Sequence, residues 1–411
     1  MFTDFTFLAF QTAMNDILLA IDFGTTRTKV AHFDFERNEP RLIPLNRDMS
    51  YFIPSVFYVP EGDGDILVGD DAQEKGENDP IGLIIGLKRE LHQFGKKHLG
   101  PNRRSVKRIE LASKLFAHIR QECEQKKFHG QSITSCRLTM PAVFNDSQRE
   151  GIRKAAEDGG FSKIEMIDEP VAAAQHWLTQ DGQRVAESVV VCDVGGGTTD
   201  FALLQLKDGR FQCDDKVTST GVERGGNDLD NEIWKQMLAE QREEERNILQ
   251  RLSSGFLLKV RKIREVNYRD NRPAISVSVS GISATVTKDL IQRTIGEFVT
   301  EVQAAAQRFI KKCQVARIES SPILLVGGAS RTEGLKSALE VLKFGEVLEW
   351  FDSDYAVVLG AVSKPCIDES CPSGRSQSQY QQAKDRRDII RDPPQQTEQT
   401  RPSYDPKKPL W

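Results

Sequence analysis

One stretch constrains the fold of this chain more than any other: residues 191–203 read VCDVGGGTTDFAL. A β-branched run at 188–192 precedes the glycines and an apolar run at 201–206 follows them, which predicts two strands joined by a glycine turn. Such a turn presents consecutive backbone N–H groups to an anion, and glycine allows close approach. Asp193 and Asp200 would hold a hydrated Mg²⁺, because hard cations prefer oxygen ligands. No Gly-Lys-Ser/Thr follows, so this turn is not a Walker-A loop.

A second copy of this pattern occurs near the N-terminus, where residues 17–31 read ILLAIDFGTTRTKVA. A strand again ends in an aspartate, Asp22, and a turn of Gly24, Thr25 and Thr26 leads into a second strand. Glycine hairpins are common, so either turn alone is weak evidence. Together, each with an Asp at the strand end, they predict a duplicated architecture with one phosphate clamp in each of two lobes.

A third glycine turn lies toward the C-terminus, where residues 322–331 read PILLVGGASR. The pattern predicts a buried strand, a turn at Gly327 and Gly328, and then the start of a helix. Such a turn brings the backbone close to a flat ligand such as adenosine, and Arg331 would lie against its face. The alternative is an ordinary strand-to-helix connection.

The stretch between the turns is more specific. Residues 139–174 read TMPAVFNDSQREGIRKAAEDGGFSKIEMIDEPVAAA. The three turns resemble the sugar kinase/actin/heat-shock chaperone ATPase superfamily, and this run closely resembles the nucleotide-binding domain of the heat-shock protein 70 (DnaK) chaperones. The resemblance covers about residues 16–363. It implies an α/β, bilobal actin-like ATPase (ribonuclease-H-like) fold, with two duplicated lobes around a nucleotide cleft.

The resemblance also assigns roles to individual residues. It implies a catalytic set comprising Asp22, Lys88, Glu169, Asp193, Thr198 and Asp200, with Asp22, Asp193 and Asp200 on the magnesium side. It implies nucleotide contacts from Gly24, Thr25, Thr26, Gly195, Gly196, Gly197, Thr198, Gly225, Gly226, Arg261, Lys262, Gly327, Gly328, Arg331 and Asp354. Pro141 and Glu169 match the pair that links lobe motion to hydrolysis. Arg261 and Lys262 fall where the family has a Lys-Arg pair around the adenine, and Arg27 departs from the usual polar residue.

The chemistry implied is hydrolysis of ATP to ADP and phosphate, with Mg²⁺ and with K⁺ as a further candidate ion. Such hydrolysis requires a positioned water and neutralised charge more than covalent participation. Lys88, Mg²⁺ and the backbone N–H groups of both turns would stabilise the developing charge. The water would be oriented or deprotonated by one of four residues, among which the sequence does not choose: Glu169, Asp193, Thr198 and Asp200.

Bulk composition predicts an ordinary globular protein. The formal net charge of −4 gives no reason to expect nucleic acid or an anionic membrane as a partner. The seven cysteines form no CxxC pair, which is typical of free thiols in a reducing cytoplasm. A basic run over residues 96–108 lacks interleaved aromatics, so we expect a solvated loop and helix start there.

The predicted organisation has four parts, which are an N-terminal extension (1–15), lobe I (16–185, with a closing helix at 354–363), lobe II (186–353) and a polar tail (364–411). Within lobe II the patterns predict helix over 229–268, a hairpin over 274–286 and helix over 290–312. The tail is rich in Gln, Ser, Asp, Arg and Pro, so we expect it to be disordered and to contain no peptide-binding domain.

Two classes of function fit these observations. The first is a chaperone-like ATPase, slow and regulated by a partner, whose lobes open and close and whose state is read by a co-chaperone, exchange factor or client. The second is a small-molecule kinase of the same superfamily, acting on a sugar or similar metabolite. The FNDSQR run and the GGGTTD turn favour the first, and no candidate acceptor pocket supports the second. A filament-forming actin relative and a degenerate ATPase fit less well.

Overall fold

The computed structural model describes most of the chain. The described residues are 17–93, 95–99, 102–180, 186–214, 216–267, 274–279, 282–349 and 353–363. The predicted N-terminal extension and polar tail therefore lie outside the described residues.

The first sheet has six strands in the described part of the chain, in the order β11-β10-β1-β2-β3, with β4 paired to β2. Strand β1 runs antiparallel to β2 and parallel to β10, so it is the centre of the sheet. Buried apolar side chains make β1 a core strand on both faces. The strands are β1 (Leu18–Phe23), β2 (Arg27–Asp34), β3 (Glu39–Leu42), β4 (Ile53–Pro54), β10 (Ser135–Met140) and β11 (Lys163–Asp168).

The second sheet repeats this plan. Its order is β14-β13-β12-β18-β19, with β15 paired to β13. Here β12 is the central strand, antiparallel to β13 and parallel to β18. The strands are β12 (Ser188–Val194), β13 (Thr199–Lys207), β14 (Arg210–Cys213), β15 (Thr220–Val222), β18 (Ile323–Val326) and β19 (Val347–Glu349). Each sheet thus starts from a hairpin with a glycine turn, as the sequence predicts.

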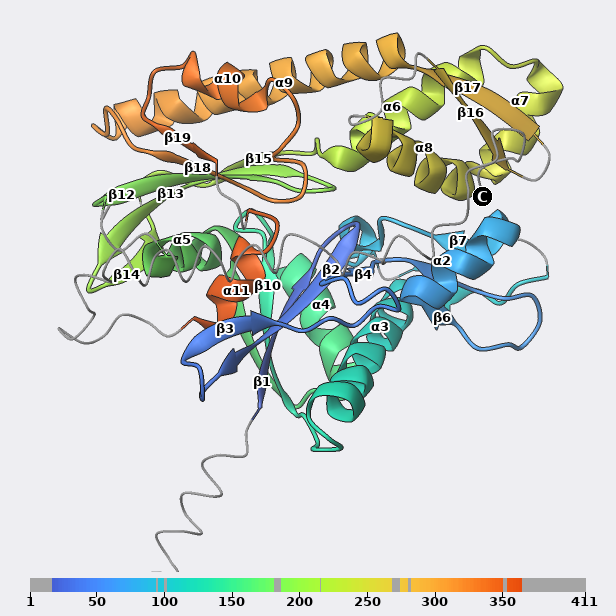
Figure 1. Ribbon diagram of the computed structural model, residues 1–411, viewed down its shortest axis with the longest axis horizontal. Coiled ribbons are helices and arrows are strands. Elements are labelled where there is room, and N and C mark those ends of the chain that lie inside the picture. The colour runs from blue at the N-terminus through green and yellow to red at the C-terminus, as the bar shows by residue number, and fades with distance from the viewer. Residues whose placement is uncertain are drawn as a thin grey trace, which may run out of the picture.

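Two helices, α5 (Glu169–Gln180) and α11 (Ala356–Val362), lie between the sheets (Figure 1). Their small side chains allow this close packing. A Cβ on Gly360 of α11 would collide with the backbone of Ala172 in α5. One apolar cluster joins these helices to β1, β2, β12 and β18. The last described helix therefore packs against the first strands of the chain.

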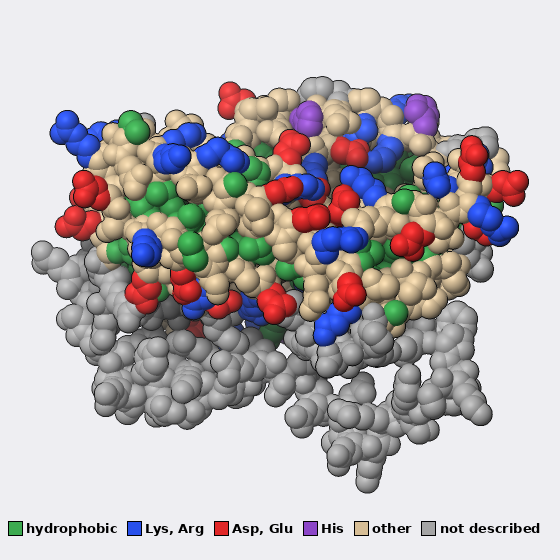
Figure 2. Space-filling view, turned by 90° about the horizontal axis from the view of Figure 1, so that it is seen from above, with side chains coloured by type: hydrophobic (Ala, Val, Ile, Leu, Met, Phe, Trp, Pro, Cys, Tyr) green, Lys and Arg blue, Asp and Glu red, His purple; other side chains and the backbone are tan. Residues whose placement is uncertain are grey.

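Other helices cover the outer faces of the sheets. Apolar side chains of α3 (Arg108–Glu122) and α4 (Asp146–Asp158) join the core of the first sheet, and α9 (Lys288–Val315) and α10 (Leu335–Glu340) join that of the second. On the outer face of the second half, acidic and basic side chains are interspersed (Figure 2). The segment from 290 to 312 is helical, as expected.

Two smaller regions extend beyond the sheets and face each other across the molecule (Figure 1). The first contains α2 (Gly69–Asn78), β5 (Phe57–Tyr58), β6 (Leu67–Val68), β7 (Leu83–Ile84) and the 3-10 helices η1 (Pro80–Gly82) and η2 (Leu87–Glu90). The second contains α6 (Gly226–Ala239), α7 (Glu243–Arg251), α8 (Ser253–Asn267) and the hairpin β16 (Ala274–Val279) and β17 (Ile282–Thr287). Helices and hairpin match the patterns read over 229–286.

One local prediction was wrong, and another, for the basic run that ends where α3 begins at Arg108, was confirmed only in part. The helix expected directly after the Gly327–Gly328 pair starts only at Leu335, because the intervening residues form turns. The basic run is not uniformly solvated. Short strands β8 (Lys96–Lys97) and β9 (Val106–Lys107) pair within it, and Arg103 is buried against Asp79. The Asp79 carboxylate, which lies outside the run, offsets the cost of burying that arginine.

The division between lobes at residues 185 and 186 stays a prediction. All strands of the first sheet precede that point, and all strands of the second follow it. Among the described residues, no helix is both long and apolar enough to cross a membrane. The cysteines of the described part are free, namely Cys123, Cys136, Cys192, Cys213 and Cys313.

Candidate active site

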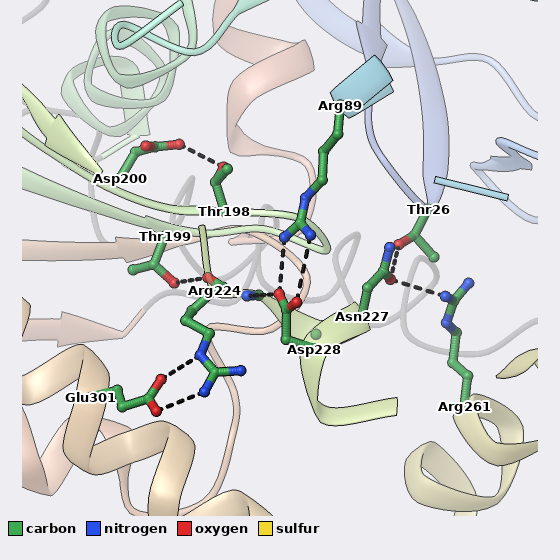
Figure 3. Close-up of polar contacts among 12 residues, drawn as sticks. Thr26, Arg89, Thr198, Thr199, Asp200, Arg224, Asn227, Asp228, Arg261 and Glu301 are labelled. Atoms are coloured by element: carbon green, nitrogen blue, oxygen red, sulfur yellow. Dashed lines mark hydrogen bonds and ion pairs between the residues drawn. The ribbon is translucent and has the colours of Figure 1, made fainter. Parts of the chain in front are cut away.

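The two predicted phosphate turns lie face to face between the sheets. A Cβ on Gly196 would collide with the Thr26 hydroxyl, and one on Gly197 would lie 2.6 Å from the Thr25 hydroxyl. The Thr26 hydroxyl donates to Asn227 Oδ1 at 2.9 Å, which joins the first turn to the start of α6 (Figure 3). Glycine at positions 196 and 197 therefore allows the two turns to approach this closely.

Four carboxylates meet below these turns. Asp22 is 6% exposed, Glu169 and Asp200 are each 8% exposed, and Asp193 is partly buried. The β12–β13 register places Asp193 directly opposite Asp200. Electrostatic interactions connect Asp193 with the other three. The structure therefore brings together the predicted magnesium-side aspartates and Glu169.

Two lysines neutralise part of this negative charge. Lys88 of η2 donates to Glu169 Oε1 at 2.8 Å, and both side chains are nearly inaccessible to water. Lys29 of β2 donates to Asp22 Oδ2 at 3.1 Å, opposite it in the β1–β2 register. The sequence identified Lys88 but not Lys29. A spacing of seven residues from Asp22, equal to that between Asp193 and Asp200, was the signal.

The protonation equilibria reflect this balance. Burial raises the pKa of Asp193 well above its ordinary value, and the Glu169 and Asp200 carboxylates raise it further. Burial likewise raises the pKa of Asp200 to about 7, although a hydrogen bond from Thr198 opposes the rise. Asp22 is buried too, but Lys29 and Lys88 outweigh burial and lower its pKa. The site thus favours binding of further positive charge near Asp193 and Asp200.

Thr198 lies where it can orient a group beside the carboxylates. Its hydroxyl donates to Asp200 Oδ2 at 2.8 Å, while the buried Oδ1 of Asp200 has no hydrogen-bond partner among the described residues (Figure 3). Glu169 begins α5 directly after β11, and Pro141 directly follows β10. The register pairs Met140 with Asp168, so Pro141 and Glu169 extend from neighbouring strand ends.

The Gly225–Gly226 turn packs on the second phosphate turn. A Cβ on Gly225 would lie 2.7 Å from the backbone of Gly195 and Gly196. Asp228 caps helix α6 by accepting from the Gly225 N–H at 2.8 Å, and it also accepts from Arg89 at 2.9 Å (Figure 3). The Nε of Arg89 is buried without a hydrogen-bond partner in the described part of the chain.

The third turn lies beside the second. Gly327 has a φ of +90°, which favours glycine, and a Cβ there would collide with Asp193. Its N–H donates to the carbonyl of Ser353 at 3.0 Å. Arg331 forms an ion pair with Asp354 at 3.4 Å, and a Cβ on Gly328 would lie 3.9 Å from Asp354 Oδ1. These predicted adenosine-side residues therefore converge.

Helix α8 places its cations Arg261, Lys262 and Arg264 in different surroundings. Arg261 is buried, donates to Asp230 at 3.0 Å and Asn227 at 2.9 Å, and lines a cavity of about 520 Å³ beside η2. Lys262 is exposed. Arg264, which the sequence did not identify, donates to Asp230 at 2.7 Å and to the carbonyl of Gly226 at 3.3 Å. Arg264 therefore packs beside the glycine turn of α6.

The donor set fits a hydrated divalent ion better than direct ligation. Among the described residues, no three His, Cys, Asp or Glu side chains form a ready-made metal cluster. Mg²⁺ keeps several waters and is usually held by one or two carboxylates together with substrate phosphates. Asp200 accepts one side-chain hydrogen bond, from Thr198, and its other oxygen has no hydrogen-bond partner among the described residues, which fits an ion held through its waters.

Paired sheets, repeated hairpins and central helices define an actin-like ATPase fold. A family model described as Hsp70 protein matches residues 18–370. The chain belongs to the Hsp70 family, whose members are chaperones that bind ATP, use Mg²⁺ and act with protein partners.

Proposed function

We propose that this chain is an ATP-driven conformational switch that hydrolyses ATP in the cleft between its two sheets. The observation that supports this most is the apposition of the Thr25–Thr26 turn and the Gly196–Gly197 turn above four carboxylates. Backbone N–H groups from both halves would hold the phosphates, so the relative position of the halves would depend on the phosphates present.

The side chains below the turns would carry the chemistry. Asp22, Asp193 and Asp200 would hold the hydrated Mg²⁺, which supplies charge neutralisation at the phosphate oxygens. The Lys88 ammonium, fixed by Glu169 at 2.8 Å, would stabilise charge developing on the transferred phosphate. Thr198 would orient the attacking water. Its hydroxyl donates a hydrogen bond to Asp200, so the lone pairs of the Thr198 oxygen remain available to accept a hydrogen bond from the water.

We further propose that Arg264 takes the adenosine role expected of Arg261 and Lys262. Arg261 lies with its guanidinium directed to Asp230 and Asn227, whereas Arg264 packs next to Gly226 and across from Ala329. A planar guanidinium stacks well on an aromatic base. Arg331, with 51% of its side chain exposed, would cover the ligand from the side of Asp354.

Hydrolysis in this proposal is slow and regulated by a separate protein partner: a co-chaperone, exchange factor or client. Contacts between the halves support a switch, because Thr26–Asn227 and Arg89–Asp228 must change if the cleft opens. The switch would act without a peptide-binding domain in residues 364–411. It would work in the cytoplasm, a compartment that suits the free cysteines of the described residues.

Single-turnover ATP hydrolysis with Mg²⁺ tests the proposal, with an Asp193→Ala variant beside the unaltered protein. We expect slow phosphate release that the variant loses. An Asp63→Ala variant, altered at an exposed side chain between β5 and β6, should behave as the unaltered protein. Failure to bind ATP would contradict the proposal. Tight binding without release, even with a partner, would favour the kinase alternative.

A further inference from the structure

Lys29 and Asp200 hold the same position in the two hairpins. In the first hairpin the register pairs Asp22 with Lys29, and in the second it pairs Asp193 with Asp200. The duplicated plan thus places a lysine on one side of the site where it places a carboxylate on the other. The Lys29 ammonium lies 3.1 Å from Asp22 Oδ2, and its side chain is only 13% exposed.

The charges around Lys29 explain why a cation is stable there. Moving a lysine out of water is costly, and nearby carboxylates must offset that cost. Electrostatic interactions connect Lys29 with Asp22, Asp354 and Asp193, of which Asp22 is the strongest. Asp354 has its own partner in Arg331. Lys29 is therefore a fixed positive charge within the magnesium-side carboxylates.

The two lysines offset half of the carboxylate charge at this site. When ionised, Asp22, Glu169, Asp193 and Asp200 carry four negative charges, and Lys29 and Lys88 remove two of them. One divalent ion balances the remaining two. A separate monovalent cation such as K⁺ beside Asp22 would be repelled by the Lys29 ammonium, which already contacts Asp22 Oδ2, while Asp22 Oδ1 accepts from Thr139 at 3.2 Å.

We propose that the Lys29 ammonium is a built-in substitute for a monovalent metal cation, so that nucleotide binding by this protein does not depend on K⁺. The inference rests on the proposed nucleotide site. A lysine ammonium is a compact point charge with three donors, which suits it to take the place of a small cation among oxygen ligands. The K⁺ expected from the family resemblance then has no role here.

The test measures ADP affinity by calorimetry with Mg²⁺, at one ionic strength, in K⁺, Na⁺ or N-methylglucamine. We expect the unaltered protein to bind equally, within about twofold, in all three salts. Lys29→Gln and Lys29→Met should lose roughly tenfold or more in N-methylglucamine and recover most of it in K⁺, because the vacated position can then admit the ion. A Lys235→Gln variant, altered at a side chain 70% exposed, is the matched control.

K⁺-dependent binding by the unaltered protein would overturn the inference, as would variants that remain folded by thermal melting but show no recovery in K⁺. Two different substitutions protect against loss of folding in one, and Lys29→Arg, which keeps the charge, should remain indifferent to K⁺. If the unaltered protein binds no ADP in any salt, the proposed function itself fails, and this inference with it.

Discussion

Arg89 joins Asp228 across the cleft: the Nη2 of Arg89 lies 2.9 Å from the Asp228 carboxylate, between residues 139 apart in sequence. Asp228 also caps the N-terminus of α6, whose first residues include Gly226. A side chain of η2 is therefore connected directly to the turn that packs on the phosphate loop. The pair connects the two halves of the molecule at the point where, in the proposed function, they separate to release a nucleotide.

Breaking this ion pair should accelerate nucleotide release. With side chains 33% and 16% exposed, we expect the pair to contribute about 0.5–1 kcal/mol, and hence Arg89→Ala to raise the ADP dissociation rate roughly two- to fivefold. Stopped-flow release of a fluorescent ADP measures this rate. Arg224→Ala breaks the Arg224–Glu301 pair, which lies within the second half, and should leave the rate unchanged. Equal effects of both variants would contradict the proposed role.

Removing the Lys88 ammonium should affect cleavage more than binding. Its contact with Glu169 places it to stabilise developing charge, so we expect Lys88→Met to slow single-turnover hydrolysis by about a hundredfold or more. The ADP affinity should change by less than tenfold, since ADP lacks the phosphate in question. Quenched-flow hydrolysis and calorimetry separate the two effects. A variant that hydrolyses ATP normally would exclude Lys88 from the chemistry.

The close approach of the phosphate turns predicts contrasting effects of two Gly→Ala substitutions. Gly196→Ala would force the Thr26 hydroxyl away, so we expect ADP affinity to fall at least about tenfold. Gly296→Ala, in α9, meets nothing within 4 Å and should raise the free energy of unfolding by about 0.8–1 kcal/mol without affecting binding. Denaturant unfolding and calorimetry test both. Unimpaired binding by Gly196→Ala would show that the turns need not meet.

The position of Arg264 predicts which cation of α8 contacts the base. Arg264→Ala should weaken ADP binding roughly tenfold or more, since stacking and a hydrogen bond to the Gly226 turn are lost together. Lys262→Ala, on the exposed side of the helix, should bind normally. Calorimetric titration with ADP compares them. The reverse order of effects would restore the role first expected of Lys262.

The raised pKa of Asp200 predicts a pH dependence of stability in the metal-free and nucleotide-free protein. Burial raises this pKa from 3.8 to about 7, so between these values the folded state binds more protons than the unfolded state. The free energy of unfolding should therefore fall as pH rises from about 4 to 7, by up to roughly 1.4 kcal/mol per pH unit for this group. Asp200→Asn should reduce that slope in denaturant titrations. An unchanged slope would contradict the assignment to Asp200.

Local pattern was enough to predict the elements that carry the site. The two strand–glycine–strand units could be predicted because strand periodicity and turn composition depend on neighbouring residues alone. Asp22 and Asp193 lie near the end of the first strand of each unit. The hairpin over 274–286 was predictable in the same way. Lys29 was equally predictable, since a hairpin fixes its cross-strand partner and its spacing from Asp22 equals that of Asp200 from Asp193.

Other features required contacts between distant segments. The rotation of α8 decides that Arg264 contacts the Gly226 turn, Arg261 faces Asp230 and Asn227, and Lys262 faces solvent, and that rotation is set by packing. Arg103 is buried because Asp79 comes to it from another segment. The sequence by itself determined the turns, the strands and the aspartates at their ends, since each depends on local backbone preference. Only the tertiary structure decided which charges meet, because ion pairs such as Arg89–Asp228 form between residues that approach only when both sheets are assembled.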